Sequence, residues 1–295
     1  MIKIIDNKWL YLFALSLIWG SSFILIKKGL IGLSPLQLGS LRIVFSSIII
    51  FMIGFKFLKK IEKSKWKWIA ISGFIGTFFP AFLFAYAETE IDSSIASILN
   101  SLVPMNTVLI GFTIFKISTT KIQTIGVIIG FIGTIYLIIS GSEINPDQNY
   151  LYAGFVILCT VLYATNVNLI KKYLNDVNAI ALATGHFIII FFPAVFVLIY
   201  SDFFKTNYMS NNIIQESLIY VLILSFFGTA LAKILFNKLI QTSSPVFASS
   251  VTYSMLVISL FLGILDGELF TLSQGLATIL IILGVYLSNK KKPTK

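Results

Sequence analysis

The sequence has few charged residues for its length. Only 12% of its 295 residues are Asp, Glu, Lys or Arg, whereas 57% are hydrophobic and the mean hydropathy is +0.93. Soluble domains are about one quarter charged, and so few charges could not cover the apolar surface of a water-soluble protein of this length. These values exclude a soluble domain and indicate that lipid surrounds most of the chain.

Cysteine, histidine and arginine each occur once, as Cys159, His186 and Arg42. A single cysteine excludes an intramolecular disulfide, and one residue of each ligand type argues against a His/Cys metal site. The chain also lacks the Gly-x-x-x-x-Gly-Lys-Ser/Thr loop that would cradle a nucleotide phosphate, so we expect no ATP hydrolysis and no cofactor. The excess of basic over acidic residues lies in short loops, so it does not predict binding to nucleic acid.

Long apolar runs recur ten times along the chain. A spanning helix needs roughly 20 mostly apolar residues and satisfies its own backbone hydrogen bonds. No segment alternates every second residue for long, which argues against a β-barrel. The predicted fold class is an all-α membrane protein with ten transmembrane helices. The runs lie near residues 9–26, 35–55, 67–87, 93–115, 122–140, 151–170, 178–200, 217–237, 244–265 and 271–288.

Lysines and acids separate when the loops are assigned alternately to two sides of a membrane. One side holds 18 of the 21 lysines, many of them in the loop 56–67, and the other holds nine of the 12 acids. Lysine-rich short loops remain in the cytoplasm. The sequence therefore predicts that the lysine-rich side, with both termini, is cytoplasmic.

The two halves of the chain contain equivalent residues. Trp19 is matched by Tyr163 and Arg42 by His186, each displaced by 144 residues. Later motifs are displaced by 152 residues, namely Gly76-Thr77 with Gly228-Thr229 and Ala96-Ser97 with Ala248-Ser249. We predict a first five-helix repeat at 1–141, a second at 150–289 and a basic cytoplasmic tail at 290–295.

The linker between the second and third spans differs in charge between the repeats. It is rich in lysine in the first half, whereas in the second half it holds Asp202 and Glu216. Equivalent loops of opposite charge indicate that the two halves insert in opposite directions. Inverted repeats are typical of secondary transporters, whose substrate site lies near the midplane where the halves meet.

Several of these motifs resemble the EamA family of the drug/metabolite transporter (DMT) superfamily. They are 19–23 (WGSSF) in the first span, Arg42 in the second, 96–104 (ASILNSLVP) in the fourth and the glycines Gly126, Gly130 and Gly133 in the fifth. The resemblance covers essentially the whole chain as two tandem five-helix units. It implies a carrier of the bacterial cytoplasmic (inner) membrane, often an exporter of amino acids, related metabolites or drugs. The Gly126-x-x-x-Gly130 spacing by itself predicts close packing between helices.

Seven residues inside the spans are candidates for lining a substrate cavity between the halves. They are Trp19, Ser22, Arg42, Asn100, Tyr163, Asn166 and His186. Tryptophan prefers the membrane interface, so Trp19 in mid-span is either a packing residue or one aromatic wall of the cavity. Tyr163, its equivalent, would form the opposing wall, and Ser22 would let helices or substrate approach closely.

Charged and polar groups inside a membrane are costly unless they face a cavity or a partner. Arg42 is expected to reach the outer headgroups, to anchor a substrate carboxylate or phosphate, or to pair with an acid such as Glu88. His186 is either a packing residue or a group that couples transport to protons. Asn100 and Asn166 are expected to contact substrate or to form hydrogen bonds between helices.

Three further ionisable residues lie near span ends. Glu88 and Glu90, at the outer end of the third span, are predicted to take part in gating or proton coupling, with a solvated surface position as the alternative. Lys233 lies near the cytoplasmic end of the eighth span. We expect its side chain to extend toward the headgroups.

The function predicted from these features is secondary transport of small organic metabolites (amino acids or related compounds, or drugs) by alternating access. Export is the predicted direction, and the predicted partners are a small-molecule substrate and the lipid bilayer. Proton coupling is a further possibility, and no enzyme activity is predicted. One alternative is a membrane-embedded enzyme acting on a lipid-linked substrate, although the outer acids are scattered over several loops and helix ends. Another is a passive channel, which a flux measurement would separate from a carrier.

Overall fold

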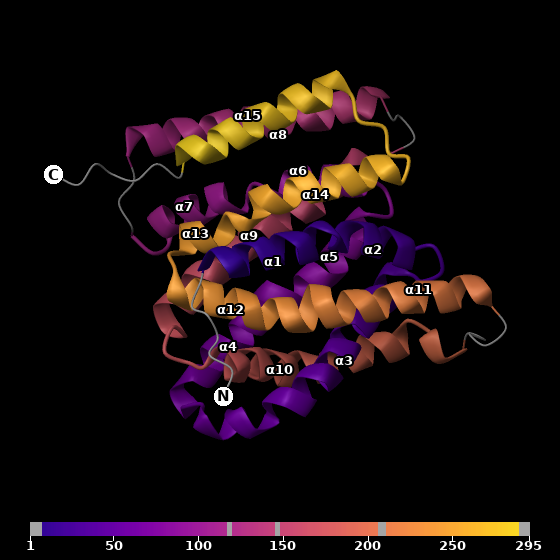
Figure 1. The fold of residues 1–295 in the computed structure, drawn as a ribbon, viewed down its shortest axis with the longest axis vertical. Helices are drawn as coiled ribbons and strands as arrows, with labels where there is room; N and C mark the ends of the chain where they lie inside the picture. Colours follow the sequence, from indigo (N-terminus) through magenta and orange to yellow (C-terminus); the bar gives the residue numbers. More distant parts are fainter. Residues whose placement is uncertain (1–7, 117–119, 145–147, 206–210, 289–295) are drawn as a thin grey trace.

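The structure of the chain, a computed structural model, describes residues 8–116, 120–144, 148–205 and 211–288, with the backbone alone at 141–144. Every regular element in these ranges is helical (Figure 1). Nine helical segments there are long and apolar enough to cross a membrane, and a tenth apolar helix, Leu272–Leu287, is shorter. The fold is therefore an all-α membrane fold, and the ten apolar helices predicted from the sequence are confirmed.

The first half of the chain supplies five spans, three of which are interrupted. The elements of these spans are α1 (Lys8–Gly20) with α2 (Ser22–Gly29), α3 (Pro35–Gly54), α4 (Trp66–Gly73) with η3 (Phe74–Phe78) and α5 (Phe79–Ala87), α6 (Ser93–Asn100) with α7 (Val103–Thr113), and α8 (Lys121–Ile144). Two short 3-10 helices, η1 (Phe55–Lys60) and η2 (Lys63–Lys65), lie between the second and third spans.

The second half repeats this arrangement. Its spans are α9 (Ala153–Tyr173), α10 (Ala179–Tyr200), α11 (Asn212–Ile223) with η7 (Leu224–Leu231) and α12 (Ala232–Thr242), α13 (Pro245–Ser249) with α14 (Val251–Leu265), and α15 (Leu272–Ser288). Short 3-10 helices, η4 (Tyr150–Tyr152) and η5 (Phe203–Lys205), lie at loop ends. The interruptions η3 and η7 are both π-helices and occupy equivalent places in the third and eighth spans. π-Helices are rare and occur often at functional sites.

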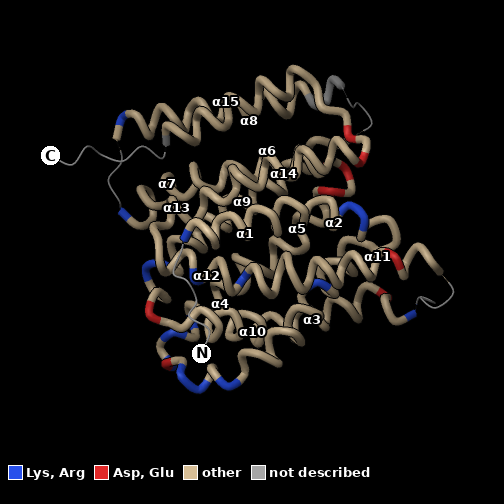
Figure 2. The backbone as a smooth tube through the Cα atoms, in the orientation of Figure 1, with Lys and Arg blue, Asp and Glu red and all other residues tan. Residues whose placement is uncertain are grey.

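The helices run between two sides of different charge (Figure 2). The side on which α1 begins and α15 ends carries most of the lysines, and we call it the lysine side. The opposite side, where α5 ends and α14 ends, carries most of the acids, and we call it the acidic side. Glu143 and Asp147 are predicted from the sequence to lie on this side too, but their side chains are outside the part of the chain that the structure describes.

The two halves run in opposite directions between these sides. The equivalent helices α2 and α9 each end in a lysine pair, but α2 ends on the acidic side whereas α9 ends on the lysine side. Large apolar side chains cover the outside of the bundle, including Met52 (85% exposed), Phe192 (74%) and Val257 (70%). Such an outer surface is compatible with lipid and not with water.

The fifth and tenth spans, α8 and α15, pack against each other beside the remaining helices (Figure 1). A Cβ atom placed on Gly284 would clash with the backbone of Gly130, and one on Gly133 would lie 2.9 Å from the Ile281 nitrogen. Only glycine permits this approach of two backbones. The close packing predicted from the glycine spacing in the fifth span is confirmed.

Candidate functional site

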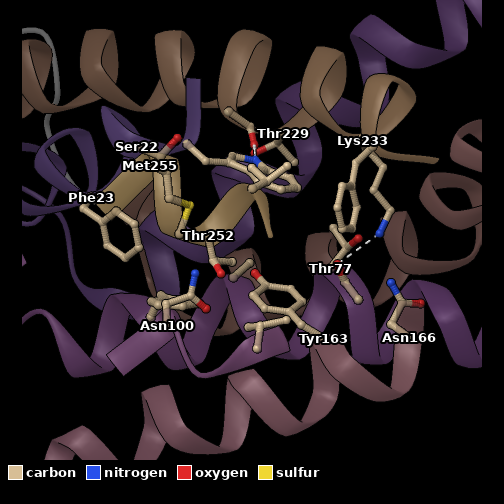
Figure 3. Close-up of a pocket in the computed structure, with 18 of the residues that line it drawn as sticks. Ser22, Phe23, Thr77, Asn100, Tyr163, Asn166, Thr229, Lys233, Thr252 and Met255 are labelled. Carbon is tan, nitrogen blue, oxygen red and sulfur yellow. Dashed lines mark hydrogen bonds between the residues drawn. The ribbon is translucent and has the colours of Figure 1, made fainter. Parts of the chain in front are cut away.

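A cavity of about 100 Å³ lies between the two halves (Figure 3). Its lining comes from spans one to four and from their counterparts six, eight and nine. The sequence predicts polar side chains near the midplane, because polar residues inside the spans recur at equivalent positions of the two halves.

Most of the lining residues form pairs related by the internal repeat. These pairs are Trp19 with Tyr163, Ser22 with Asn166, Gly76 with Gly228, Thr77 with Thr229, Ala81 with Lys233, Phe84 with Phe236, Asn100 with Thr252, and Val103 with Met255. Both repeats thus contribute equivalent positions to one cavity. Inverted repeats place a substrate site where the two halves meet, and this cavity lies between them.

Six of the seven predicted lining residues line this cavity, and His186 does not. His186 is fully buried, and neither ring nitrogen has a hydrogen-bond partner in the described part of the chain. A Cβ atom on Gly73 would lie 3.4 Å from the Cα of His186, so α10 packs closely against α4 here. His186 is equivalent to Arg42, but the shorter imidazole does not reach the cavity from the second helix of its repeat.

Trp19 forms part of one wall and joins the two halves. Its Nε1 donates a hydrogen bond of 3.0 Å to the carbonyl oxygen of Gly228 in η7. Its ring packs edge-on against Phe236, with the ring centroids 4.8 Å apart. On the other wall, Tyr163 stacks against Phe84 at 6.1 Å. Trp19 therefore has both roles that the sequence allowed, because it packs against another helix and also forms part of the cavity wall.

Two cationic side chains reach the cavity. Arg42 Nε donates to Thr229 Oγ1 at 2.7 Å. Lys233 Nζ donates to the carbonyl oxygen of Gly76 at 3.0 Å (Figure 3). Lys233 is only 6% exposed. The expectation that its side chain extends to the headgroups is therefore wrong. The position of Lys233 four residues after Thr229, on the same helix face, is the signal that could have placed it here.

Each cation contacts the π-helix of the opposite half. Arg42 comes from α3 and contacts η7, whereas Lys233 comes from α12 and contacts η3. Glycine is needed in both π-helices because a Cβ atom on Gly76 would clash with the Asn166 amide, and one on Gly228 would lie 2.6 Å from Ser22 Oγ. Side chains of each half thus fit closely against the interrupted helix of the other.

Some polar atoms at the cavity have no partner within the described chain. Asn100 Oδ1 and Thr77 Oγ1 are buried and make no hydrogen bond there. Asn166 differs, because its Oδ1 accepts a hydrogen bond of 2.5 Å from Ser72. Asn166 therefore makes the interhelical contact that was the alternative for it, whereas Asn100 leaves an acceptor available to a solute.

Glu88 and Glu90 lie outside the cavity, near the acidic side. Glu88 is 7% exposed, and neither carboxylate oxygen has a hydrogen-bond partner in the described residues. Burial, reinforced by the charge of Glu268, raises the pKa of Glu88 well above its usual range, although Arg42 and Lys27 act in the opposite direction. Glu90 is partly exposed. Their part in gating or coupling stays a prediction.

An ion cluster on the acidic side was not predicted. Lys27 Nζ lies 2.8 Å from Glu268 Oε1 and 3.0 Å from Asp266 Oδ2, and Lys28 also pairs with Asp266. Glu268 accepts from the Ser93 and Ser94 backbone nitrogens at 3.0 and 2.9 Å, so it caps α6. Although burial opposes the shift, the hydrogen bonds from Lys27 and the two serines hold the pKa of Glu268 below its usual value.

This cluster connects cavity-lining helices to the loop after α14. α2 carries Ser22 and Phe23 to the cavity, and α6 carries Asn100. The interaction between Lys27 and Glu268 joins residues 241 positions apart in the chain. The sequence placed both residues on one side of the membrane but contained no local pattern that could pair them.

Comparison with known proteins finds similarity to transporters over nearly the whole chain. The sequence profile of the EamA-like transporter family matches twice, at residues 8–139 and 151–290. An uncharacterized transporter of Archaeoglobus fulgidus is 25% identical, over 97% of this chain and all of its own. The uncharacterized inner membrane transporter YedA of Escherichia coli K12 is 26% identical, over 95% of this chain and 92% of its own.

The fold agrees with that of a solved crystal structure whose description names no function. The TM-score is 0.66 at 16% sequence identity, with 96% of each chain covered. That likeness concerns the fold alone. The two profile matches together cover most of the chain, and the chain belongs to the EamA-like transporter family.

Proposed function

We propose that this protein is a secondary transporter that works by alternating access. Its proposed substrates are small organic metabolites, either amino acids and related compounds or drugs. The observation that carries the proposal is the cavity itself, which is built from repeat-equivalent residues of two oppositely directed halves. Inverted repeats around a midplane site allow the same site to open to either side as one half moves against the other.

The contacts between the halves fit such a movement. Trp19, Arg42 and Lys233 each use one hydrogen bond across the halves, and all three bonds end on η3 or η7. π-Helices are rare and occur often at functional sites. These three contacts surround the cavity, whereas the glycine contact between α8 and α15 does not involve its lining residues.

The proposed orientation follows from charge, and the proposed direction follows from the resemblance to the family. The lysine side is assigned to the cytoplasm by the bias of lysines in short loops, which places both ends of the chain there. Export from the cytoplasm is the direction proposed, as in many transporters with this repeat. The bacterial inner membrane is the proposed location.

Flux measured in proteoliposomes tests the proposal. Purified protein is reconstituted into vesicles, and the vesicles are loaded with each member of a panel of radiolabelled metabolites and drugs. Counter-transport is then measured for the wild type and for Trp19→Ala. We expect saturable flux that Trp19→Ala abolishes. Phe192→Ala is the matched control, because Phe192 is 74% exposed on the outer surface and remote from the lining. Absence of flux for the whole panel, or unsaturable flux at channel rates, would refute carrier function.

A further inference from the structure

Building on the proposed function, we infer that the cavity selects organic anions, meaning solutes with a carboxylate on an uncharged, largely apolar body. The charges of the lining carry this inference. Two lining residues are cationic, Arg42 and Lys233, and no Asp or Glu is among the residues that line the cavity. A transported cation would meet two like charges and no opposite one.

Neither cation is neutralised by the described part of the chain. Lys233 has a single hydrogen bond, to the carbonyl oxygen of Gly76, and Arg42 has a single one, to the hydroxyl of Thr229. Both acceptors are neutral, and donors remain on Lys233 Nζ and on both terminal nitrogens of Arg42. A charge held inside a membrane without a counter-charge is costly. A carboxylate entering the cavity would supply that counter-charge and bind the remaining donors.

The nearby acids do not substitute for a ligand. Glu88 influences Arg42 electrostatically but makes no hydrogen bond to it. Because burial raises the pKa of Glu88 well above its usual range, this carboxyl group favours its neutral form. Glu268 and Asp266 are already paired with Lys27. The positive charge at the cavity is therefore available to a solute.

The arrangement of the lining also favours a solute with two chemically different ends. Lys233 lies at one end of the cavity with Thr77 and Asn166 (Figure 3). The other end holds Phe23 and Met255 together with the uncharged polar residues Ser22, Asn100 and Thr252. Tyr163 lies between these groups. Aromatic and thioether side chains bind an apolar body, and a few placed polar groups fix its orientation. The inferred solute places its carboxylate toward Lys233 and its apolar part toward Phe23.

Three solutes with the same phenylalkyl body separate charge from shape. At neutral pH 3-phenylpropionate carries a net negative charge, phenylalanine is zwitterionic and phenethylamine is cationic. Thermal unfolding of the purified protein is measured against the concentration of each, since a ligand of the folded state raises Tm. We expect 3-phenylpropionate to raise Tm, phenylalanine to act with roughly tenfold lower affinity, and phenethylamine to have no effect.

The variant Lys233→Met tests the assigned residue. Methionine keeps the length and the apolar stem but removes the charge, so the ligand-free variant should fold with an equal or higher Tm because an unpaired buried charge is gone. The rise in Tm caused by 3-phenylpropionate should disappear. Lys238→Met is the matched control, on the same helix but outside the lining, and it should keep that rise.

The outcomes distinguish this inference from the proposed function. Equal or stronger stabilisation by phenylalanine or phenethylamine, no stabilisation by any of the three, or an unchanged response in Lys233→Met would overturn anion selectivity. Proteoliposome flux of cations or zwitterions in preference to anions would also overturn it while leaving transport intact. Binding of 3-phenylpropionate that Lys233→Met abolishes, together with no flux of any solute, would support the anion site and refute transport.

Discussion

The two lysine pairs at equivalent helix ends have different partners. Lys27 and Lys28, at the end of α2, pair with the carboxylates of Asp266 and Glu268 on the acidic side. Lys171, at the end of α9, instead donates to the backbone carbonyls of Ile240 and Gln241 at 3.3 and 3.2 Å on the lysine side. Lys172 lies 5.2 Å from the centres of the Phe115 and Tyr173 rings.

The difference originates in the sequence of the repeat. The positions equivalent to Asp266 and Glu268 in the first half, 152 residues earlier, are Ile114 and Lys116. The lysine side therefore has no acid at the place where the acidic side has two. An ammonium beside a carboxylate gains the attraction of two opposite charges in addition to the hydrogen bond, which a neutral carbonyl does not supply.

At these equivalent helix ends the acidic side is joined by ion pairs, whereas the lysine side is joined by hydrogen bonds to neutral carbonyls. Elsewhere on the lysine side Lys65 pairs with Asp176, but the Asp176 side chain is 62% exposed, and exposed ion pairs contribute little. We therefore expect the halves to separate more readily on the lysine side.

The largest expected effect comes from removing the best-paired acid of the cluster. Glu268→Gln leaves Lys27 with one carboxylate fewer and weakens the cap on α6, and Glu268 is only 1% exposed in its side chain. We expect a loss of about 3 kcal/mol in stability, seen as a lower Tm. In a Cys159→Ser background, a cysteine at Ile26 should also react faster with a thiol reagent applied from the acidic side. Equal labelling rates in the two proteins would argue that the cluster does not close this side.

A pH series sharpens the comparison at a second unequal pair, Glu88 and its equivalent Ile240. Glu88 faces Arg42, Lys27 and Glu268, and its pKa is raised in the folded protein. The folded state then binds more protons than the unfolded state, so stability falls as pH rises above the unfolded value near 4.5. The slope is at most about 1.4 kcal/mol per pH unit. Glu88→Gln should lose this slope in Tm measured from pH 4.5 to 8, and retention of the slope would assign it to another group.

A direct contrast of the two lysine pairs should give a smaller effect. Lys171→Met removes hydrogen bonds to neutral carbonyls and should cost about 1 kcal/mol or less. Lys27→Met leaves the buried Glu268 without its cation and should cost about 2 to 3 kcal/mol. The two Tm values, measured in the same detergent, decide the matter. A larger loss in Lys171→Met would reverse the proposed order of the two sides.

Transplanting an acid to the lysine side should have the smallest effect on stability. Ile114→Asp places a carboxylate at the position equivalent to Asp266, and exposed ion pairs contribute about 0 to 1 kcal/mol. We expect little change in Tm but slower flux in proteoliposomes, because the lysine side would then also be held by charge. Ile114→Asn supplies the same shape without the charge and should transport as the wild type does. Slowing in both variants would point to the loss of isoleucine instead.

Much of the fold could be predicted because its signals are local. Run length and lysine bias gave ten helices and the opposed directions of the halves, since both depend on the chain near each residue. Six cavity residues could be found because polar or aromatic groups in mid-span recur at the repeat displacement. Asn100 and Asn166 were chosen because they lie in segments that resemble the central helices of the EamA family, and both line the cavity.

Lys233 was misplaced because its depth in the membrane was estimated from its distance to the predicted end of the span. The eighth span was predicted at 217–237, which put Lys233 near its end, but the helical segment is 31 residues long and continues to Thr242. Lys233 therefore lies well inside the helix. The ion pair of Lys27 with Glu268 joins residues 241 positions apart. No pattern in one sequence encodes such a pairing, because it depends on how the two halves pack.

The hydrogen bond from Lys233 to the carbonyl oxygen of Gly76 has a consequence for the third span. The carbonyl oxygen of Gly76 occupies a donor that an arriving carboxylate would need. A carboxylate that displaces it releases a backbone acceptor of η3, and that acceptor regains a partner if the π-turn rewinds to an α-helical turn. The bond therefore fastens a cavity-lining side chain of one half to the turn of the third span whose backbone departs from the α-helical hydrogen-bond pattern.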